Sequence, residues 1–178
     1  MPEQQTGRDK SVRPSLVRSL IVIAIFTAAS AAGGLVKLPA GVGSVALDST
    51  FGFFCAGFFS PLIGGFVGAF GHLASAATAG FPLGPAHFVI AVQMFAWCWL
   101  FGFIVRKINR TWSLVIAAAV AILLNGVASP LMLIPISPPE MKPVLIGLIG
   151  FLLIASTINV VLACIAIFIL SKLDIPGI

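Results

Sequence analysis

Apolar residues run almost without interruption along this chain, in stretches separated by short segments rich in glycine, proline or charge. A helix that crosses a bilayer needs roughly 20 predominantly apolar residues. Six stretches meet or approach that length: Ser15–Val36, Ser44–Phe59, Leu62–Ala79, Pro85–Val105, Trp112–Ile134 and Val144–Leu170. The pattern therefore predicts an all-α integral membrane protein, a bundle of six transmembrane helices.

The second stretch is the shortest, and Pro61 separates it from the third. An alternative with five spans fuses the two into one helix kinked at the proline. With six spans and a cytoplasmic N-terminus, only Lys37 and Lys142 of the ten basic residues face outward. The other eight face the cytoplasm: Arg8, Lys10, Arg13, Arg18, Arg106, Lys107, Arg110 and Lys172. With five spans the split is even, so the positive-inside rule favours six spans with both termini cytoplasmic.

Composition agrees with a membrane location. Hydrophobic residues make up 60% of the chain and charged residues 8%, against about a quarter charged in soluble domains. The net charge of +5 comes from residues near the ends of spans, so membrane topology explains it and nucleic-acid binding does not follow. We expect a cytoplasmic tail over residues 1–14, one transmembrane substrate-binding domain over 15–172, and a second tail over 173–178.

Residues for catalysis are scarce. The acidic residues all lie at or near ends and loops: Glu3, Asp9, Asp48, Glu140 and Asp174. Ion-coupled transporters usually carry an acidic group inside the membrane, so this distribution argues against one. The sequence has no GxxxxGK[ST], HExxH or GxSxG motif. Three cysteines lack metal-ligand spacing: Cys55, Cys98 and Cys164. We therefore expect no enzymatic activity, cofactor or metal site.

Four neutral polar residues fall near the middle of four different spans. They are His72, Gln93, Asn125 and Asn159. One interpretation is that they join the helices by hydrogen bonds, each worth about 0.6 kcal/mol. The other is that some of them line a pocket for an uncharged polar ligand.

Further candidates for ligand contacts lie toward the outer side. Asp48 precedes the second span, where it either caps a helix or contacts ligand. His87 opens the fourth span, and Phe51 offers a ring that could stack on a flat ligand. We expect the pocket between the loop Lys37–Asp48 and the fourth to sixth spans.

Small residues repeat every four positions on the first span, at Ala24, Ala28 and Ala32. Residues with this spacing share one helix face and let another helix approach closely. Gly64 and Gly68 repeat in the same way on the third span. The alanines form either a packing seam inside the bundle or a docking surface for a partner.

The size, the six spans, the alanine repeat and the Gly/Pro-rich loop after it resemble the S component of an energy-coupling factor (ECF) vitamin transporter. The resemblance covers nearly the whole chain. It implies a multi-pass subunit of the bacterial plasma membrane that binds a vitamin from outside. It also implies a coupling subunit that docks on Ala24, Ala28 and Ala32, and two ATPase subunits that drive release.

A narrower resemblance concerns the substrate. The stretches Gly43–Ser49 (GSVALDS), Gly71–Leu73 (GHL) and Gly80–Gly84 (GFPLG) are similar to the S components assigned to alpha-ribazole. That ligand is a dimethylbenzimidazole riboside used in cobalamin salvage. S components for thiamine, riboflavin, folate and hydroxymethylpyrimidine share the general architecture, so they remain alternatives, as does a stand-alone facilitator.

Overall fold

The computed structural model describes residues 16–35, 37–39, 44–108 and 112–173. Within them the chain is almost entirely helical, apart from one short hairpin. The longer helices are α1 Leu16–Gly33, α2 Thr50–Phe58, α3 Pro61–Thr78, α4 Ala86–Lys107, α5 Trp112–Leu123 and α7 Met141–Leu170. Three short helical segments continue α5: the π-helix η1 Leu124–Ala128, α6 Ser129–Leu133 and the 3-10 helix η2 Ile134–Ile136. The hairpin pairs β1 Lys37–Pro39 with β2 Ser44–Ala46.

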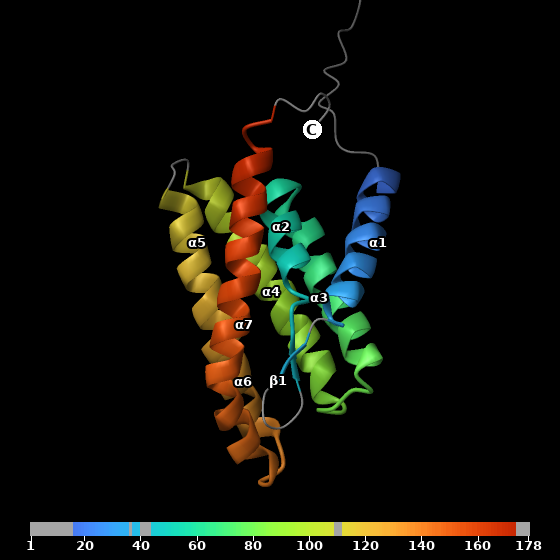
Figure 1. Ribbon diagram of the computed structural model, residues 1–178, viewed down its shortest axis with the longest axis vertical. Coiled ribbons are helices and arrows are strands. Elements are labelled where there is room, and N and C mark those ends of the chain that lie inside the picture. Colours follow the sequence, from blue (N-terminus) through green and yellow to red (C-terminus); the bar gives the residue numbers. More distant parts are fainter. Residues whose placement is uncertain (1–15, 36, 40–43, 109–111, 174–178) are drawn as a thin grey trace, which may run out of the picture.

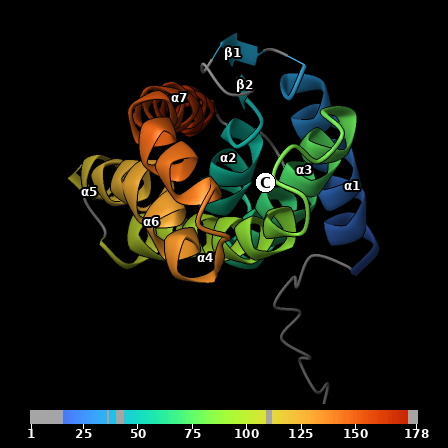
Figure 2. The ribbon, with the colours of Figure 1, turned by 90° about the horizontal axis from the view of Figure 1, so that it is seen from below.

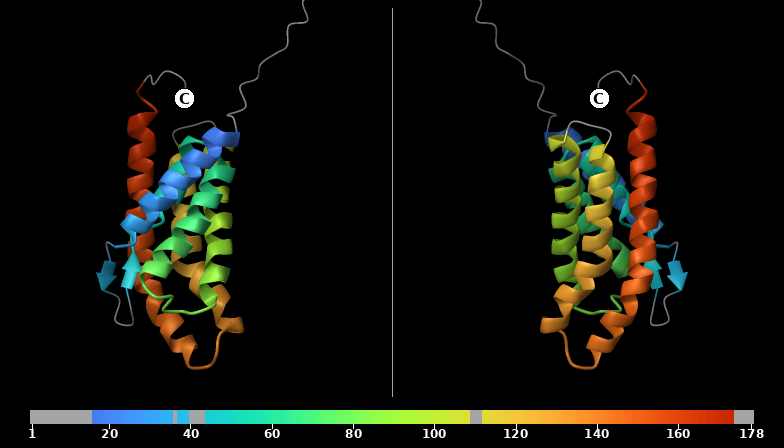
Figure 3. Two further views of the ribbon diagram at one scale, coloured as in Figure 1. Left: turned by 90° about the vertical axis from the view of Figure 1, so that its right-hand side faces the viewer. Right: turned by 90° about the vertical axis from the view of Figure 1, so that its left-hand side faces the viewer.

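Successive helical segments run in alternate directions through the bundle (Figure 1). The column from α5 to η2 counts as one segment. The end of the bundle where α1 begins and where α4 and α7 end carries Arg18, Arg106, Lys107 and Lys172, and we call it the basic end. The opposite end carries the turns 79–85 and 137–140, and we call it the loop end (Figure 3).

In the part of the chain that the structure describes, four helical segments are long and apolar enough to cross a membrane. They are Leu16–Gly33, Ala86–Lys107, Trp112–Ile136 and Met141–Leu170. Their outward faces carry exposed apolar side chains such as Ile25, Val92, Val115 and Ile154. A surface of this kind is solvated by lipid. The chain is therefore a helical membrane protein.

The second predicted helix starts later than expected. Residues Ser44–Ala46 form strand β2 and pair antiparallel with Lys37–Pro39, so the helix prediction over them is wrong. Their main-chain groups bond across the hairpin instead of along a helix. The helix begins at Thr50 and has nine residues, about 14 Å, which is short of the ~30 Å of a hydrocarbon core.

Helices α2 and α3 are antiparallel neighbours and not one kinked helix. Ser60 has an extended backbone, and its Oγ accepts a hydrogen bond from the N–H of Ile63 at 3.1 Å, which caps α3. Glycines on α3 then let the two backbones meet: Gly52 lies against Gly68, and Gly64 against Ala56. The pairing of early with late positions requires opposite chain directions.

The short helix α2 lies at the centre of the bundle, as the view along the bundle's long axis shows (Figure 2). Its residues 52–56 are buried. A Cβ on either Gly64 of α3 or Gly102 of α4 would collide with Ala56, so three helices meet tightly at this point. Phe53 and Phe101 add an edge-to-face ring contact at 5.4 Å.

Helix α1 packs on α3 through small residues. A Cβ on Gly71 would lie 2.5 Å from the Cβ of Ser30, and Gly34 meets Ser75 in the same way. This seam uses a different face from the alanine repeat. Ala24, Ala28 and Ala32 are all exposed on the outside of the bundle. Neither α3 nor any other described element covers them.

Candidate functional site

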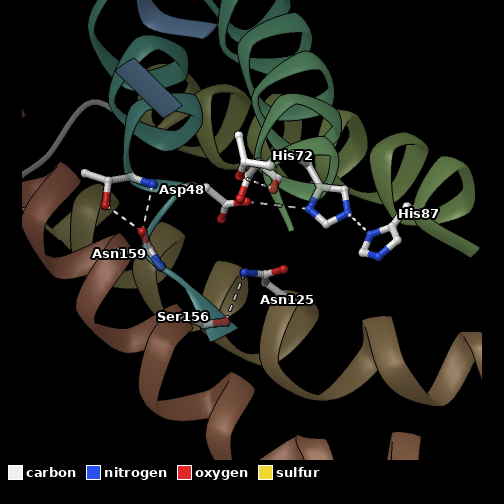
Figure 4. A network of polar contacts seen from close by, with 9 residues as sticks. Asp48, His72, His87, Asn125, Ser156 and Asn159 are labelled. Atoms are coloured by element: carbon white, nitrogen blue, oxygen red, sulfur yellow. Dashed lines mark hydrogen bonds and ion pairs between the residues drawn. The ribbon is translucent and has the colours of Figure 1, made fainter. Parts of the chain in front are cut away.

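A cavity of about 160 Å³ lies in the half of the bundle toward the loop end. Its wall combines residues from the α1 terminus, the segment before α2, and helices α3, α4, η1, α6 and α7. The polar part of the wall includes Asp48, His72, His87, Asn125 and Asn159. Five of the residues predicted to touch ligand therefore surround one space (Figure 4).

Asp48 and the two histidines form a chain of polar contacts along one side of the cavity (Figure 4). The Oδ2 atom of Asp48 lies 3.7 Å from Nδ1 of His72. The other nitrogen of His72, Nε2, lies 3.1 Å from Nδ1 of His87. The backbone N–H of Leu83 donates to Nε2 of His87 at 3.2 Å. The turn at the loop end is thus joined to Asp48 through both rings.

This chain of contacts determines which nitrogen of each ring carries the proton. A backbone N–H can only donate, so Nε2 of His87 must accept and its proton must be on Nδ1. That N–H then donates to Nε2 of His72, whose own proton is consequently on Nδ1 and faces Asp48. Both rings fit the network as neutral imidazoles, and Asp48 as the acceptor at its end.

The turn that supplies Leu83 is built by the end of α3. The N–H of Phe81 donates to the carbonyl of Ala76 at 2.9 Å and the N–H of Gly80 to that of Ala77, which is a Schellman motif. Gly80 occupies the left-handed position of that motif, with φ of +75°. The motif ends α3 sharply and sends the chain across the loop end toward α4.

Asn159 and Thr50 form a hydrogen-bonded pair at the end of the cavity farther from the loop end, which we call its deep end. The Oδ1 atom of Asn159, on α7, accepts hydrogen bonds from the N–H and Oγ1 of Thr50, at 3.0 and 2.6 Å. The side chain of Asn159 is buried, and it caps the N-terminus of α2 from another helix. The local cap position, Ser49, makes no such bond. Capping is therefore done by Asn159 and not by Asp48.

Asn125 reaches the cavity because the fifth span widens there. Residues Leu124–Ala128 form a π-helix, followed by Pro130, which has no N–H to donate. The N–H of Ser129 donates to the carbonyl of Leu124, five residues earlier, and the Oγ of Ser129 donates to the same carbonyl at 3.2 Å. The extra residue in this turn leaves Asn125 on the cavity side, where its Nδ2 donates to Ser156 at 3.0 Å.

Two predicted ligand contacts, Gln93 and Phe51, lie away from the cavity wall, and the side chain of a third, Lys37, is not described. Gln93 does not line the cavity: its Nε2 donates to the backbone carbonyl of Ser129, behind the wall, at 3.4 Å, and its Oε1 is buried without a partner. Phe51 also lies off the wall, with its ring 6.1 Å from that of Phe26. Lys37 is the first residue of β1, and its side chain lies outside the described part of the structure.

Several wall residues were not predicted. On α7 they are Leu145, Leu148, Leu152, Ala155 and Ser156. Together with Asn159 they recur every three or four positions and so form one helix face. That spacing is visible in the sequence. However, the other faces of α7 are equally apolar, so the hydropathy pattern does not indicate which face lines a cavity. Among the described residues, no group of three His, Cys, Asp or Glu side chains is placed to hold a metal ion.

Comparison with family models, curated proteins and solved structures found no match for this chain.

The deduced proton positions can be tested directly, because the chain contains only two histidines. Histidine labelled with ¹⁵N should give signals from two rings in the untagged protein at neutral pH. We predict that both rings carry the proton on Nδ1. Asp48→Ala removes the acceptor at one end and should perturb the His72 signals more than those of His87. A proton on Nε2 of either neutral ring would contradict the network.

Proposed function

We propose that this chain is the substrate-binding S component of an ECF-type importer in the bacterial plasma membrane. It captures a vitamin or vitamin precursor from outside, with alpha-ribazole, for cobalamin salvage, as the expected ligand. A coupling membrane subunit and two ATPase subunits then drive release to the cytoplasm. The chain has no phosphate-binding loop of its own, so the energy comes from these partners.

The cavity is the observation that carries this proposal. Ligand sites are typically concave and apolar, with a few convergent polar groups. Here apolar residues of α7 such as Leu148 and Leu152 line the same space as Asp48, Asn125 and Asn159. A flat heterocycle attached to a hydroxylated group matches that division, and a nucleoside is such a molecule.

The packed core favours a binding subunit over a stand-alone facilitator. A facilitator passes its substrate through and needs an opening at each end. The buried core, including Phe53, Phe101, Val160 and Ala163, occupies the half of the bundle toward the basic end. Within the described residues, the packed core therefore closes the cavity on the side toward the basic end. Release on the other side then needs a partner that reorients or deforms the subunit.

The distribution of charge supports six spans with the basic end in the cytoplasm. Arg18, Arg106, Lys107 and Lys172 gather at that end, while Lys142 lies at the loop end. Arg8, Lys10, Arg13 and Arg110 lie outside the described residues. In this arrangement α2 and the hairpin together make the second crossing, because α2 alone is too short. The cavity then lies on the outer side, where the substrate is captured.

The exposed alanines on α1 provide a docking surface for the coupling subunit. Ala24, Ala28 and Ala32 are one turn apart on a single face and project only a methyl group each. Such a face lets a partner helix approach closely in a membrane. It lies on the side of α1 away from the cavity, so docking and ligand binding use separate surfaces.

The topology predicts opposite labelling at two lysines. In a variant with all three native cysteines replaced by alanine, Lys142→Cys should react with a membrane-impermeant maleimide added to intact cells. Lys107→Cys should react only after the cells are opened. Protection of Lys142→Cys in intact cells, or labelling of Lys107→Cys from outside, would contradict the six-span orientation.

The docking surface predicts that Ala28→Trp separates binding from transport. The ring prevents close approach of the partner, so complex recovery and ATP-driven uptake should be lost. Ligand affinity of the isolated subunit should change less than about threefold. The matched control is Val115→Trp on α5, at the other side of the bundle, which should retain both functions.

The same experiment tests the alternative that the alanines are an internal seam. In that case Ala28→Trp would overpack the bundle at a cost of about 1–3 kcal/mol, and thermal stability and ligand binding would fall together. Normal assembly and uptake by Ala28→Trp would remove α1 as the docking surface.

A further inference from the structure

The part of the cavity wall that α7 supplies changes from apolar to polar with distance from the loop end. Along α7 it begins with Leu145 near the loop end, continues through Leu148 and Leu152, and ends with Ser156 and Asn159. These residues span about 21 Å of helix. Asn125 bonds to Ser156, and Thr50 to Asn159, so the polar groups of η1 and α2 lie at the same deep level.

A second, larger hollow adjoins the cavity at the loop end. It has a volume of about 420 Å³ and lies between the turn before α4 and the turn before α7. The cavity and this hollow adjoin each other, because both are lined by Pro82, Leu83 and Leu145. The described residues that line the outer hollow include no charged side chain and one polar side chain, Ser137. A hollow lined mainly by apolar residues therefore lies outside the cavity that contains Asp48, Asn125 and Asn159.

Among the described residues that line the cavity, Asp48 is the only one with a formally charged side chain. Its Oδ2 faces His72, whereas Oδ1 has no hydrogen-bond partner among the described residues. The side chain is 13% exposed, toward the space that Asn125 and Asn159 also face (Figure 4). With both histidines neutral, the described wall offers no cation. Oδ1 is thus a free acceptor for a hydroxyl or N–H, and a source of repulsion for an anion.

We infer that the ligand enters with its hydrogen-bonding end first, and that Asp48 admits neutral or cationic ligands and rejects anionic ones. This inference rests on the proposed function and narrows its substrate class. For a nucleoside, the sugar hydroxyls lie at Asp48 and Asn125, and the flat ring packs against the leucines of α7. A phosphate on the sugar would be brought against the carboxylate, so the site takes the nucleoside and excludes the nucleotide.

The first test compares alpha-ribazole with its 5′-phosphate by titration calorimetry on the purified full-length protein. The phosphate ester should bind about 100-fold more weakly. In Asp48→Asn, which keeps the shape and an acceptor for His72, that difference should shrink to about tenfold or less. Glu140→Gln removes an exposed acid outside the cavity and should leave the difference unchanged. Equal binding of nucleoside and nucleotide, or an unchanged difference in Asp48→Asn, would overturn the inference.

A second pair of probes separates this inference from the substrate assignment. Thiamine is a cation and thiamine monophosphate carries an added anionic group. If alpha-ribazole fails to bind while thiamine binds and its phosphate does not, the alpha-ribazole assignment is wrong and the charge selection stands. If no neutral or cationic probe binds, both the inference and the proposed function are wrong.

The orientation has its own test, with dimethylbenzimidazole as the ring without the sugar. Leu148→Ser should weaken binding of both the ring and the nucleoside, because both contact the leucines. Asn125→Ala should weaken only the nucleoside, by about 5- to 100-fold. Thermal unfolding checks that each variant is folded. An equal loss for ring and nucleoside in Asn125→Ala would place the ring at the deep end and contradict the orientation.

Discussion

The length of α2 is the constraint on which the rest of this structure depends. Nine residues run through the centre of a bundle whose outer helices reach 30 residues. A helix that short fills the centre only in the half toward the basic end, where Ala56 meets Gly64 and Gly102. In the other half no described helix occupies the axis, and the surrounding helices enclose a cavity. A firmly packed half and a hollow half follow from one short helix.

The hollow half is stabilised by polar contacts that also form its binding surface. Because α2 ends in mid-bundle, its first N–H groups need partners there, and Asn159 of α7 accepts from Thr50. The histidine chain similarly joins Asp48 to the turn at Leu83. An unpaired buried polar group costs about 1–3 kcal/mol. The same groups therefore organise the cavity and give it chemical selectivity.

Much of the fold could be predicted from hydropathy and charge. Helices α3, α4 and α7 and the column from α5 to η2 begin and end within a few residues of the predicted limits, since Pro61, the Gly-Pro turn and Pro138 mark clear boundaries. The hairpin could not be predicted in this way, because Ser44–Ala46 is as apolar as the helix that follows. Its strand pairing depends on Lys37–Pro39 folding back onto it.

For the site, the sequence indicated which residue types could line a cavity better than it indicated where each side chain points. Polar residues inside apolar spans are rare, so His72, Asn125 and Asn159 stood out, and all three line the cavity. Gln93 looked equivalent but lies behind Ser129, because the sequence does not specify how each helix is rotated. The π-helix at Asn125 is closed by the bond from the N–H of Ser129 to the carbonyl of Leu124, and helical periodicity in the sequence does not reveal it.

The most direct test of a ligand-binding cavity is to fill it. Ala155 and Ile154 are neighbours on α7: the first is 2% exposed and lines the cavity, and the second is 57% exposed on the outside. In titrations with alpha-ribazole, Ile154→Phe should bind like the parent protein, and a folded Ala155→Phe should bind more than about 100-fold more weakly. Equal affinity in the two variants would show that the ligand binds elsewhere and contradict the account.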